Sequence, residues 1–315
     1  GDSSRDAGAG VRSLAVLPFE NLSPDPGNEY FSDGMTEELI TTLGRVDGLS
    51  VASRTSAFAY KDRRLDIREI GQQLGVDAVV EGSVRRSGTS LRIVTQLVDA
   101  RTGYRLWSDS YDREAGDAFA VQAENARAIV AQLSGSLSHE QGSVQQGAPR
   151  NVEAYDLYLR GRYAWHERTR TGLRRAVDFF SRSVALDSTY ARAYAGLGDA
   201  YAVSAFYDYL PPRDAYPRAD SAAQRALRID PGLAAAHATV GYVLTYYHLD
   251  WPRAEEAFRR AIALDPSYSV AHQWYGNLLT AAGRFADQVS VELAGLAMPH
   301  ARIDVAVVPR AVGRD

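Results

Sequence analysis

The spacing of hydrophobic positions changes once along this chain, near residue 140. Before that point, short apolar runs at strand spacing alternate with stripes at helical spacing, and after it only helical stripes occur. The run "LAVLPF" predicts a buried strand within Arg12–Phe19. Leu39, Ile40 and Leu43 then recur on one side of a helix expected at about Asp33–Val46, which Ser32 or Asp33 is placed to cap.

The rest of the first region continues this alternation. We expect a strand at Leu49–Arg54, a helix at Asp66–Gly75, a hairpin of Asp77–Arg86 with Leu91–Asp99, a strand at Gly103–Glu114 and a helix at Phe119–Leu137. The order βαβαβββα predicts an α/β sandwich domain over residues 12–138, in which helices cover one sheet.

Polar segments separate these regions. Residues 1–11 are small and polar, so we expect a disordered linker there. Residues 139–150 contain glycines without apolar periodicity and predict a linker between two domains. Residues 301–315 continue no pattern and predict an irregular tail.

A repeat fills residues 151–300. "ALDSTYARAYAGLGDAY", "RIDPGLAAAHATVGYVL" and "ALDPSYSVAHQWYGNLL" share one pattern, in which a helix ends, a turn follows and a new helix begins. Pro231 and Pro266 are 35 residues apart, while the gap from Ser188 to Pro231 is 43 because "AFYDYLPPRD" is inserted. This pattern resembles the tetratricopeptide (TPR) family, whose period is about 34 residues. It predicts an all-α solenoid of about three and a half helix pairs.

The first region resembles the TolB-like amino-terminal domain of bacteria. The similarity covers residues 12–138 and rests on "AVLPFENLSPDPGNEYFSDGMTEELITTL", "VASRTSAFAYK" and "DIREIGQQLGVDAVVEGSVRRSGTSLRIVTQLVDARTGYRLWSDSYDRE". In that family the domain is non-catalytic. Followed by TPR repeats, it resembles the C-terminal regions of some bacterial Ser/Thr kinases and adenylate cyclases. The chain contains neither G-x-x-x-x-G-K-[ST] nor G-x-G-x-x-G, so its Gly-containing opening loop does not predict a phosphate site.

Composition narrows the possible partners and the location. The 315 residues carry a net charge of −4, which does not favour nucleic acid. The chain contains no cysteine and no apolar stretch of about 18 residues, so we expect no thiol chemistry and no membrane span. We expect a fragment of a larger signalling protein, extracytoplasmic or periplasmic, with a cytoplasmic location as the alternative.

Candidate chemical groups are few. His237 and His272 occupy one repeat position, and packing explains them better than a metal pair because no carboxylate accompanies them at ligand spacing. Asp109, Asp112 and Glu114 fit the polar side of an edge strand better than an acid/base pair. We therefore predict no catalytic residues, no cofactor and no metal.

Binding to a protein or peptide is the favoured function. The TPR resemblance implies an inward-facing peptide groove. Its expected residues are Arg192, Asp199, Ala238, Tyr242, Thr245, Gln273, Asn277 and Thr280. Two lengthened loops offer a second candidate surface with Tyr207, Tyr209, Tyr247 and Trp251, although local packing explains these aromatics equally well.

Two functional hypotheses follow. The preferred one is a non-catalytic sensor or scaffold module that binds a protein or peptide. The alternative is a ligand- or nucleotide-sensing regulatory domain of a membrane-bound Ser/Thr kinase or adenylate cyclase. The partner and the oligomeric state stay open at this point.

Overall fold

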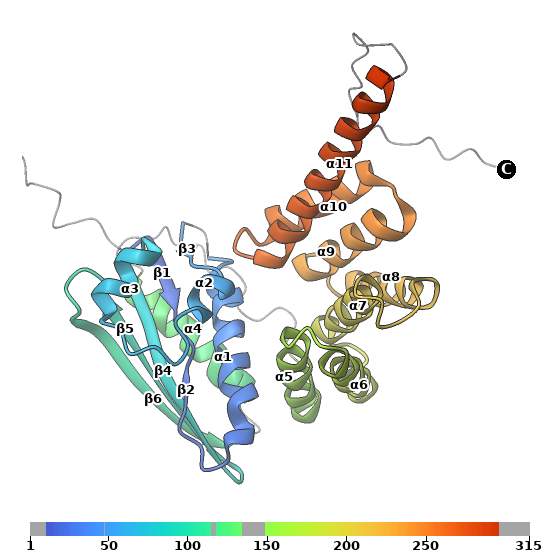
Figure 1. The fold of residues 1–315 in the computed structure, drawn as a ribbon. Helices are drawn as coiled ribbons and strands as arrows, with labels where there is room; N and C mark the ends of the chain where they lie inside the picture. Colours follow the sequence, from blue (N-terminus) through green and yellow to red (C-terminus); the bar gives the residue numbers. More distant parts are fainter. Residues whose placement is uncertain (1–10, 47, 115–117, 134–148, 296–315) are drawn as a thin grey trace, which may run out of the picture.

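The computed structural model describes residues 11–46, 48–114, 118–133 and 149–295. They form a mixed-sheet α/β domain and a region of helix pairs, which lie side by side (Figure 1). This confirms the predicted fold class. The predicted linkers and the C-terminal tail fall almost entirely outside the described residues, so those boundaries stay predictions.

The sheet of the first domain is mixed. Its strands are β1 (Ser13–Val16), β2 (Glu20–Asn21), β3 (Ser50–Val51), β4 (Ala78–Ser87), β5 (Ser90–Asp99) and β6 (Arg105–Glu114). Strand order is β3-β1-β4-β5-β6, with β2 paired to β4. β1 runs parallel to β3 and β4, whereas β4, β5 and β6 form an antiparallel meander. The predicted hairpin is therefore confirmed, and Gly88 takes the positive φ of 57° that its turn needs.

Two helices cover one face of this sheet, α1 (Glu29–Leu43) and α4 (Ala118–Leu133). Leu91, Ile93 and Leu97 alternate along β5 and are buried beneath them. The predicted helix at Asp66–Gly75 is helix α3 (Ile67–Leu74), which ends at the C-cap Gly75 with a left-handed φ of 67°. A short helix α2 (Arg54–Phe58), which was not predicted, begins at the last residue of the strand expected at Leu49–Arg54.

Helix α1 begins earlier than predicted. A 3-10 turn, Pro26–Asn28, leads directly into it, so its first residue is Glu29. The expectation that Ser32 or Asp33 caps this helix is therefore wrong. Asp33 lies inside the helix, where its carboxylate accepts hydrogen bonds from the Lys61 ammonium at 2.6 and 2.7 Å.

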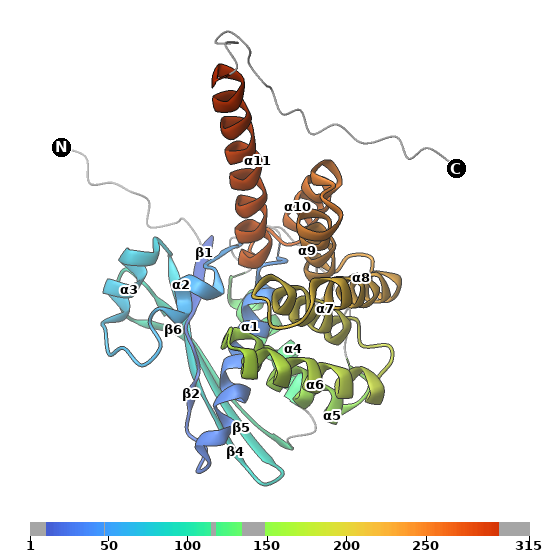
Figure 2. The ribbon, with the colours of Figure 1, turned by 45° about the vertical axis from the view of Figure 1, so that its right-hand side comes forward.

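The second region is a stack of helix pairs. The first helices of the pairs are α5 (Val152–His166), α7 (Ala191–Phe206), α9 (Ala234–Val243, continued by a π-helix over Leu244–His248) and α11 (Ser269–Gly295). The second helices are α6 (Arg170–Leu186), α8 (Pro212–Ile229) and α10 (Trp251–Leu264). Helix α11 has no such partner among the described residues, and its far end projects from the stack (Figure 2). The helical repeat solenoid is confirmed.

Buried aromatic rings set the distance between paired helices. A Cβ built on Gly161 would lie 2.5 Å from the Phe180 ring, and one on Gly241 would lie 2.9 Å from the Phe258 ring. Both phenylalanines are fully buried. The glycines therefore let a large ring fill the space between helices that approach closely.

Candidate functional site: the inner face of the repeats

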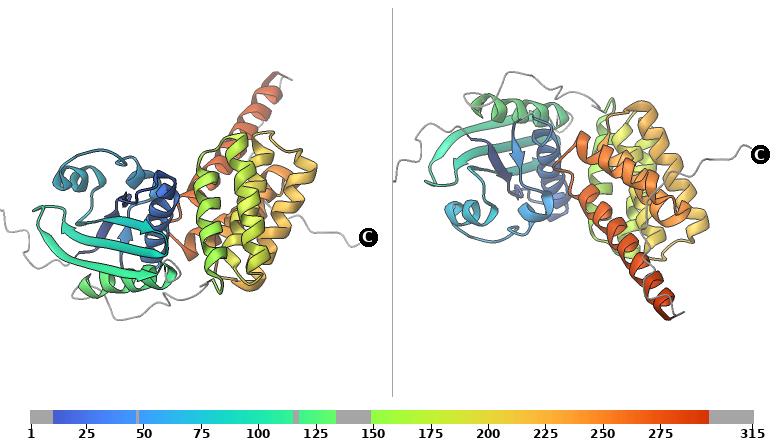
Figure 3. Two further views of the ribbon diagram at one scale, coloured as in Figure 1. Left: turned by 90° about the horizontal axis from the view of Figure 1, so that it is seen from below. Right: turned by 90° about the horizontal axis from the view of Figure 1, so that it is seen from above.

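Helix α1 of the first domain lies against the repeats. We call the surface formed by α5, α7, α9 and the start of α11 the inner face. Helix α1 runs along its α5 side (Figure 3) and reaches the loop before α11, where a Cβ on Gly44 would meet Ser267. A Cβ built on Gly34 would lie only 2.8 Å from Cδ2 of Leu159. The glycine of "FSDG" therefore serves contact between two helices.

Glu37 carries the central ionic contact of this interface. Its carboxylate accepts hydrogen bonds from Arg162, whose Nε lies at 2.9 Å, and from His166 Nε2 at 3.0 Å, and it pairs with Arg54 Nε at 3.3 Å. Burial alone would raise the pKa of Glu37, but these partners outweigh it and hold the pKa well below its usual range. Burial lowers the pKa of His166 to about 4, so at neutral pH the two arginines balance the charge of Glu37.

Glu38 makes a second contact with the inner face. Its carboxylate pairs with Arg192 of α7 and accepts a hydrogen bond at 2.9 Å from the hydroxyl of Tyr158 on α5. The Glu38 side chain is only 4% exposed. Consecutive glutamates on α1 thus reach two different repeats, and such buried pairs fix the relative position of the elements that carry them.

Arg162 links this interface to the repeats themselves. Its Nη1 lies 3.5 Å from Oδ2 of Asp199, which is fully buried and also accepts a hydrogen bond from Thr239 of α9. Burial raises the pKa of Asp199 to about 6, although Arg162 and Thr239 oppose the rise. A chain of contacts therefore runs from Glu37 on α1 through α5 and α7 to α9.

A third contact lies near the start of α1. The hydroxyl of Tyr30 donates to Asp156 of α5 at 2.6 Å, and Arg86 of β4 donates to the same carboxylate at 2.8 Å. Arg160 reaches the other oxygen of Asp156 at 2.7 Å. Burial would raise the pKa of Asp156, but these three donors lower it, whereas burial raises the pKa of Tyr30 to about 12.

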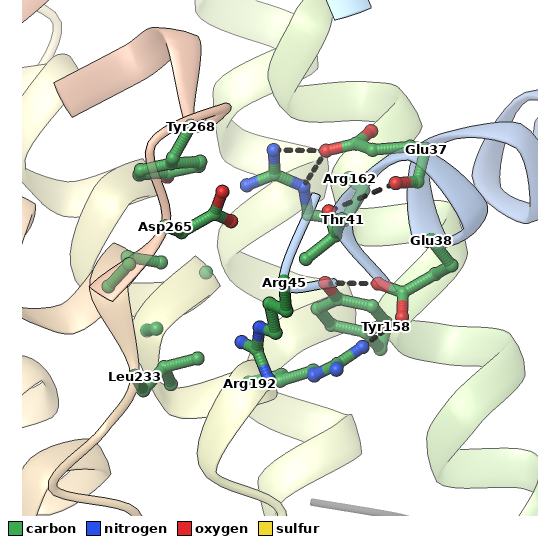
Figure 4. A pocket seen from close by; sticks show the side chains of 14 residues that line it. Glu37, Glu38, Thr41, Arg45, Tyr158, Arg162, Arg192, Leu233, Asp265 and Tyr268 are labelled. Atoms are coloured by element: carbon green, nitrogen blue, oxygen red, sulfur yellow. Dashed lines mark hydrogen bonds and ion pairs between the residues drawn. The ribbon is translucent and has the colours of Figure 1, made fainter. Parts of the chain in front are cut away.

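The space left between α1 and the inner face is small. Figure 4 shows Arg45 and Arg192 on one side of it, with Asp265 and Tyr268 opposite. This crevice has a volume of about 40 Å³, and a neighbouring one beside His166 has about 90 Å³. Such volumes accept water but not a peptide segment. Helix α1 therefore fills this part of the inner face.

Most of the predicted groove residues are not exposed. Asp199 and Ala238 have no exposed surface, Tyr242 and Thr245 are 3% exposed, and Arg192 is bound to Glu38. The expectation that these five side chains are open to a partner is wrong in this arrangement. The tetratricopeptide resemblance placed them on the correct helices, but α1 and neighbouring repeats cover them.

Three predicted groove residues are exposed: Gln273, Asn277 and Thr280 on α11. They lie about one turn apart. The side chain of Asn277 hydrogen-bonds the hydroxyl of Tyr246, and the hydroxyl of Thr280 donates to the carbonyl of Gly276 at 2.8 Å. Their role in peptide binding stays a prediction.

The lengthened loops expose part of their aromatic surface. Tyr207 is 45% exposed and Tyr247 is 40% exposed, beside Leu249 at 69%. Tyr209 and Trp251 are half-buried and pack against the core. Local packing thus explains two of the four predicted loop residues, and Tyr207 and Tyr247 remain candidates for partner contact.

The two repeat histidines have equivalent environments. Nε2 of His237 lies 3.0 Å from the carbonyl of Pro231, and Nε2 of His272 lies 2.9 Å from the carbonyl of Pro266. Each ring thus contacts the turn that precedes its own helix. Among the described residues, no group of three or more His, Asp or Glu side chains is arranged to hold a metal ion. No helix in the same residues has the length and apolar character needed to cross a bilayer.

The residues that join the two regions could not be recognised from the sequence. Glu37 and Glu38 suit the first turn of the helix expected at Asp33–Val46, and Arg86 suits the end of a hairpin exposed to solvent. Arg162 and His166 lie in "RGRYAWHERTR", which fits an exposed charged helix equally well. One usable signal was Gly34, since a glycine inside a helix often marks close approach of another element.

Comparisons with known proteins agree with parts of this description. Residues 10–128 match the family described as HilA/YgeH-like transcriptional regulator, second domain. The chain is 38% identical over 240 residues to a Rhizobium meliloti (strain 1021) protein named "Putative adenylate cyclase 3". This alignment covers 74% of the chain but only 40% of that protein.

Solved structures show weaker likeness. The TPR domain of Arabidopsis OM64 is 18% identical, covering 41% of this chain and 96% of its own, with a TM-score of 0.33. TolB from Acinetobacter baumannii is 18% identical, covering 42% of this chain and 31% of its own, with a TM-score of 0.30. The fold described above therefore rests on the helices and strands of the chain itself.

Proposed function

We propose that this chain is a non-catalytic regulatory module that binds a protein or peptide on the inner face of its repeats. The observation that carries the proposal is helix α1 itself, which the inner face already holds through Glu37 and Glu38. A surface that binds one helix by its acidic side chains has the shape and polarity for helix-in-groove recognition.

The free part of the inner face is the favoured partner site. Gln273 and Asn277 on α11 are both exposed. Gln273 lies at the edge of the crevice beside His166, and Asn277 lies one turn further along the helix. Their amides both donate and accept hydrogen bonds, as backbone recognition requires. Trp274, between them in sequence, is buried against Tyr242 with ring centroids 4.3 Å apart, which supports a rigid surface.

Capture of partners from the native host tests this proposal. We expect wild-type chain to retain a partner that the Gln273→Ala/Asn277→Ala variant loses. The loop variant Tyr207→Ala/Tyr247→Ala is the matched control, because it removes two exposed side chains outside the inner face. Loss in the loop variant alone would move the site to the loops, and retention by both variants would contradict binding through either surface.

The alternative function is regulation of an attached enzyme. The similarity to the Rhizobium protein favours it, because this chain corresponds to two-fifths of that protein and leaves room for another domain. On this proposal the module reports binding to a kinase or cyclase domain, from a location outside the cytoplasm. Joining the chain to the rest of its natural protein and measuring nucleotide turnover with and without the captured partner would separate the two functions.

A further inference from the structure

A separate hollow is formed by the repeats alone. It lies between α6, α7 and α8, and the lengthened loop after α7 closes one side. Its volume is about 430 Å³, which falls within the range of small-molecule sites, roughly 300–1,000 Å³. None of its lining residues belongs to the interface with α1, so this hollow is independent of the function proposed above.

The charged residues that line the hollow are all positive. Arg170, Arg174 and Arg218 line it, and no carboxylate does. None of the three has an ion pair with a described residue, and Asp214, one turn before Arg218 on α8, is outside the lining. Arg170 also donates to the carbonyls of Tyr209 and Asp208. Three arginines that line one hollow without a carboxylate favour an anion there. The hollow also lies at the N-terminal turn of α6, where the positive end of the helix dipole adds to the charge of the arginines.

Two tyrosine rings form the apolar part of the hollow. Arg218 lies over the Tyr201 ring at 5.8 Å from its centroid, and Arg170 lies over the Tyr209 ring at 4.8 Å. Leu210 adds apolar surface beside them. The two rings and Leu210 thus form an apolar wall next to the arginines, which suits a ligand that carries both an apolar group and a negative charge.

The loop that closes the hollow is held in place. Arg170 Nη1 donates to the carbonyl of Tyr209 at 3.1 Å, and the backbone N–H of Tyr209 donates to the carbonyl of Ser204 at 2.8 Å. The rings of Tyr207 and Tyr209 are stacked with centroids 5.6 Å apart. This loop contains the residues that lengthen the second repeat, so the insertion builds one wall of the hollow.

We propose that this hollow binds a small aromatic phosphate ester. Three arginines match the double charge and several oxygens of a phosphate better than the single charge of a carboxylate, and guanidinium groups bind phosphate in paired hydrogen bonds. The tyrosine rings select a flat ring on the ester. The repeats would thus bind a small molecule at this hollow in addition to a protein or peptide on the inner face.

Isothermal titration calorimetry of the full chain with phenyl phosphate tests the site. We expect binding that weakens roughly tenfold or more in each of the variants Arg174→Gln and Arg218→Gln. Both side chains are exposed and make no hydrogen bond to a described residue, so neither change should lower the melting temperature. Arg182→Gln is the matched control, since it removes one positive charge from α6 outside the hollow and should leave the affinity unchanged.

Other outcomes would overturn the proposal. Absence of phenyl phosphate binding at millimolar concentration, or equal binding by Arg174→Gln/Arg218→Gln and wild type, would rule out the arginine site. Inorganic phosphate binding as tightly as phenyl phosphate would rule out selection by the rings. Loss of partner capture through Gln273 and Asn277 would leave these titrations unchanged, so failure of the two proposals is distinguishable.

Discussion

One repeat position takes three different roles along the inner face. Its successive residues are Arg162, Asp199, Tyr242 and Asn277. The first two form a buried ion pair beneath α1, the third is buried among aromatic rings, and the fourth is exposed. Repeat register therefore fixes which helix face a residue occupies, whereas its neighbours decide whether that residue binds a partner or stabilises the module.

We call the part of the inner face that α1 covers its closed end, and the part formed by α11 its open end. Removing the charge of Arg162 at the closed end should have the largest effect. Arg162→Ala removes the cation that Glu37 and the fully buried Asp199 share, and the Glu37 side chain is only 14% exposed. Breaking a buried pair in this way costs about 3–5 kcal/mol. We expect the urea midpoint to fall accordingly. Arg182→Ala, which removes an exposed partner of Asp178 at 3.7 Å, should change stability by under about 1 kcal/mol, and equal midpoints for both variants would contradict the buried interface.

Tyr242 and Asn277 give the second comparison. A groove residue open to solvent would tolerate Tyr242→Ala, but this ring is 3% exposed and packs on Trp274 and Tyr246. We expect the free energy of unfolding to fall by about 3 kcal/mol because a cavity replaces the ring. Asn277→Ala should lower it by under about 1 kcal/mol, since the side chain is exposed. Similar losses in thermal unfolding would show that burial does not separate the two positions.

The closed end should also respond to pH. Asp199 has a folded pKa of about 6, above its unfolded value, so it takes up a proton on folding and stability rises as pH falls from 7.5 to 5. His166 has a folded pKa of about 4, below its unfolded value, so stability falls over the same interval. The two contributions oppose each other and should leave the wild type nearly flat.

His166→Gln separates these contributions while keeping a donor for Glu37. The variant should gain about 1 kcal/mol of stability between pH 7.5 and pH 5, because only the Asp199 contribution remains. Urea unfolding at both pH values measures the gain. A loss of stability in this variant at pH 5 would show that Asp199 does not take up its proton on folding.

The spacing of side chains predicted a helix or strand well where that spacing alone is typical of the element. The alternation along Leu91–Asp99 and the glycine turn at Gly88 predicted the hairpin, and the Ala and aromatic spacing predicted the helix pairs. Helix α1 begins at Glu29 and not near the expected Asp33, because Pro26 begins a 3-10 turn that leads directly into the helix.

The interface between the domains could not be predicted in this way. Glu37, Glu38 and Arg162 carry charges, and a charge on a helix predicts solvent unless its partner is known. The partners lie more than a hundred residues apart in sequence. These partners can be identified only from the structure of both domains together. The burial of the five groove residues also depends on contacts with distant parts of the chain, so the sequence alone predicted that they are exposed.

The smallest expected effect concerns two helix glycines, Gly34 at the closed end and Gly276 at the open end. Replacing a helix glycine by alanine stabilises a helix by about 1 kcal/mol when the space is free. A Cβ on Gly276 would meet no atom within 4 Å, so Gly276→Ala should raise the free energy of unfolding by about that amount. A Cβ on Gly34 would meet Leu159 at 2.8 Å, and such overpacking costs about 1–3 kcal/mol, so Gly34→Ala should be neutral or destabilising.

The contact with Leu159 can be isolated by a double-mutant cycle. Leu159→Ala removes the side chain that the new methyl group would meet, so Gly34→Ala should be less costly in that background than in the wild type. Urea unfolding of the four proteins gives the coupling free energy, and Gly276→Ala combined with Leu159→Ala serves as the uncoupled control. A stabilising Gly34→Ala with no coupling to Leu159 would mean that α1 does not rest on α5 in solution. The part of the inner face that α1 covers here would then be available to a partner as well.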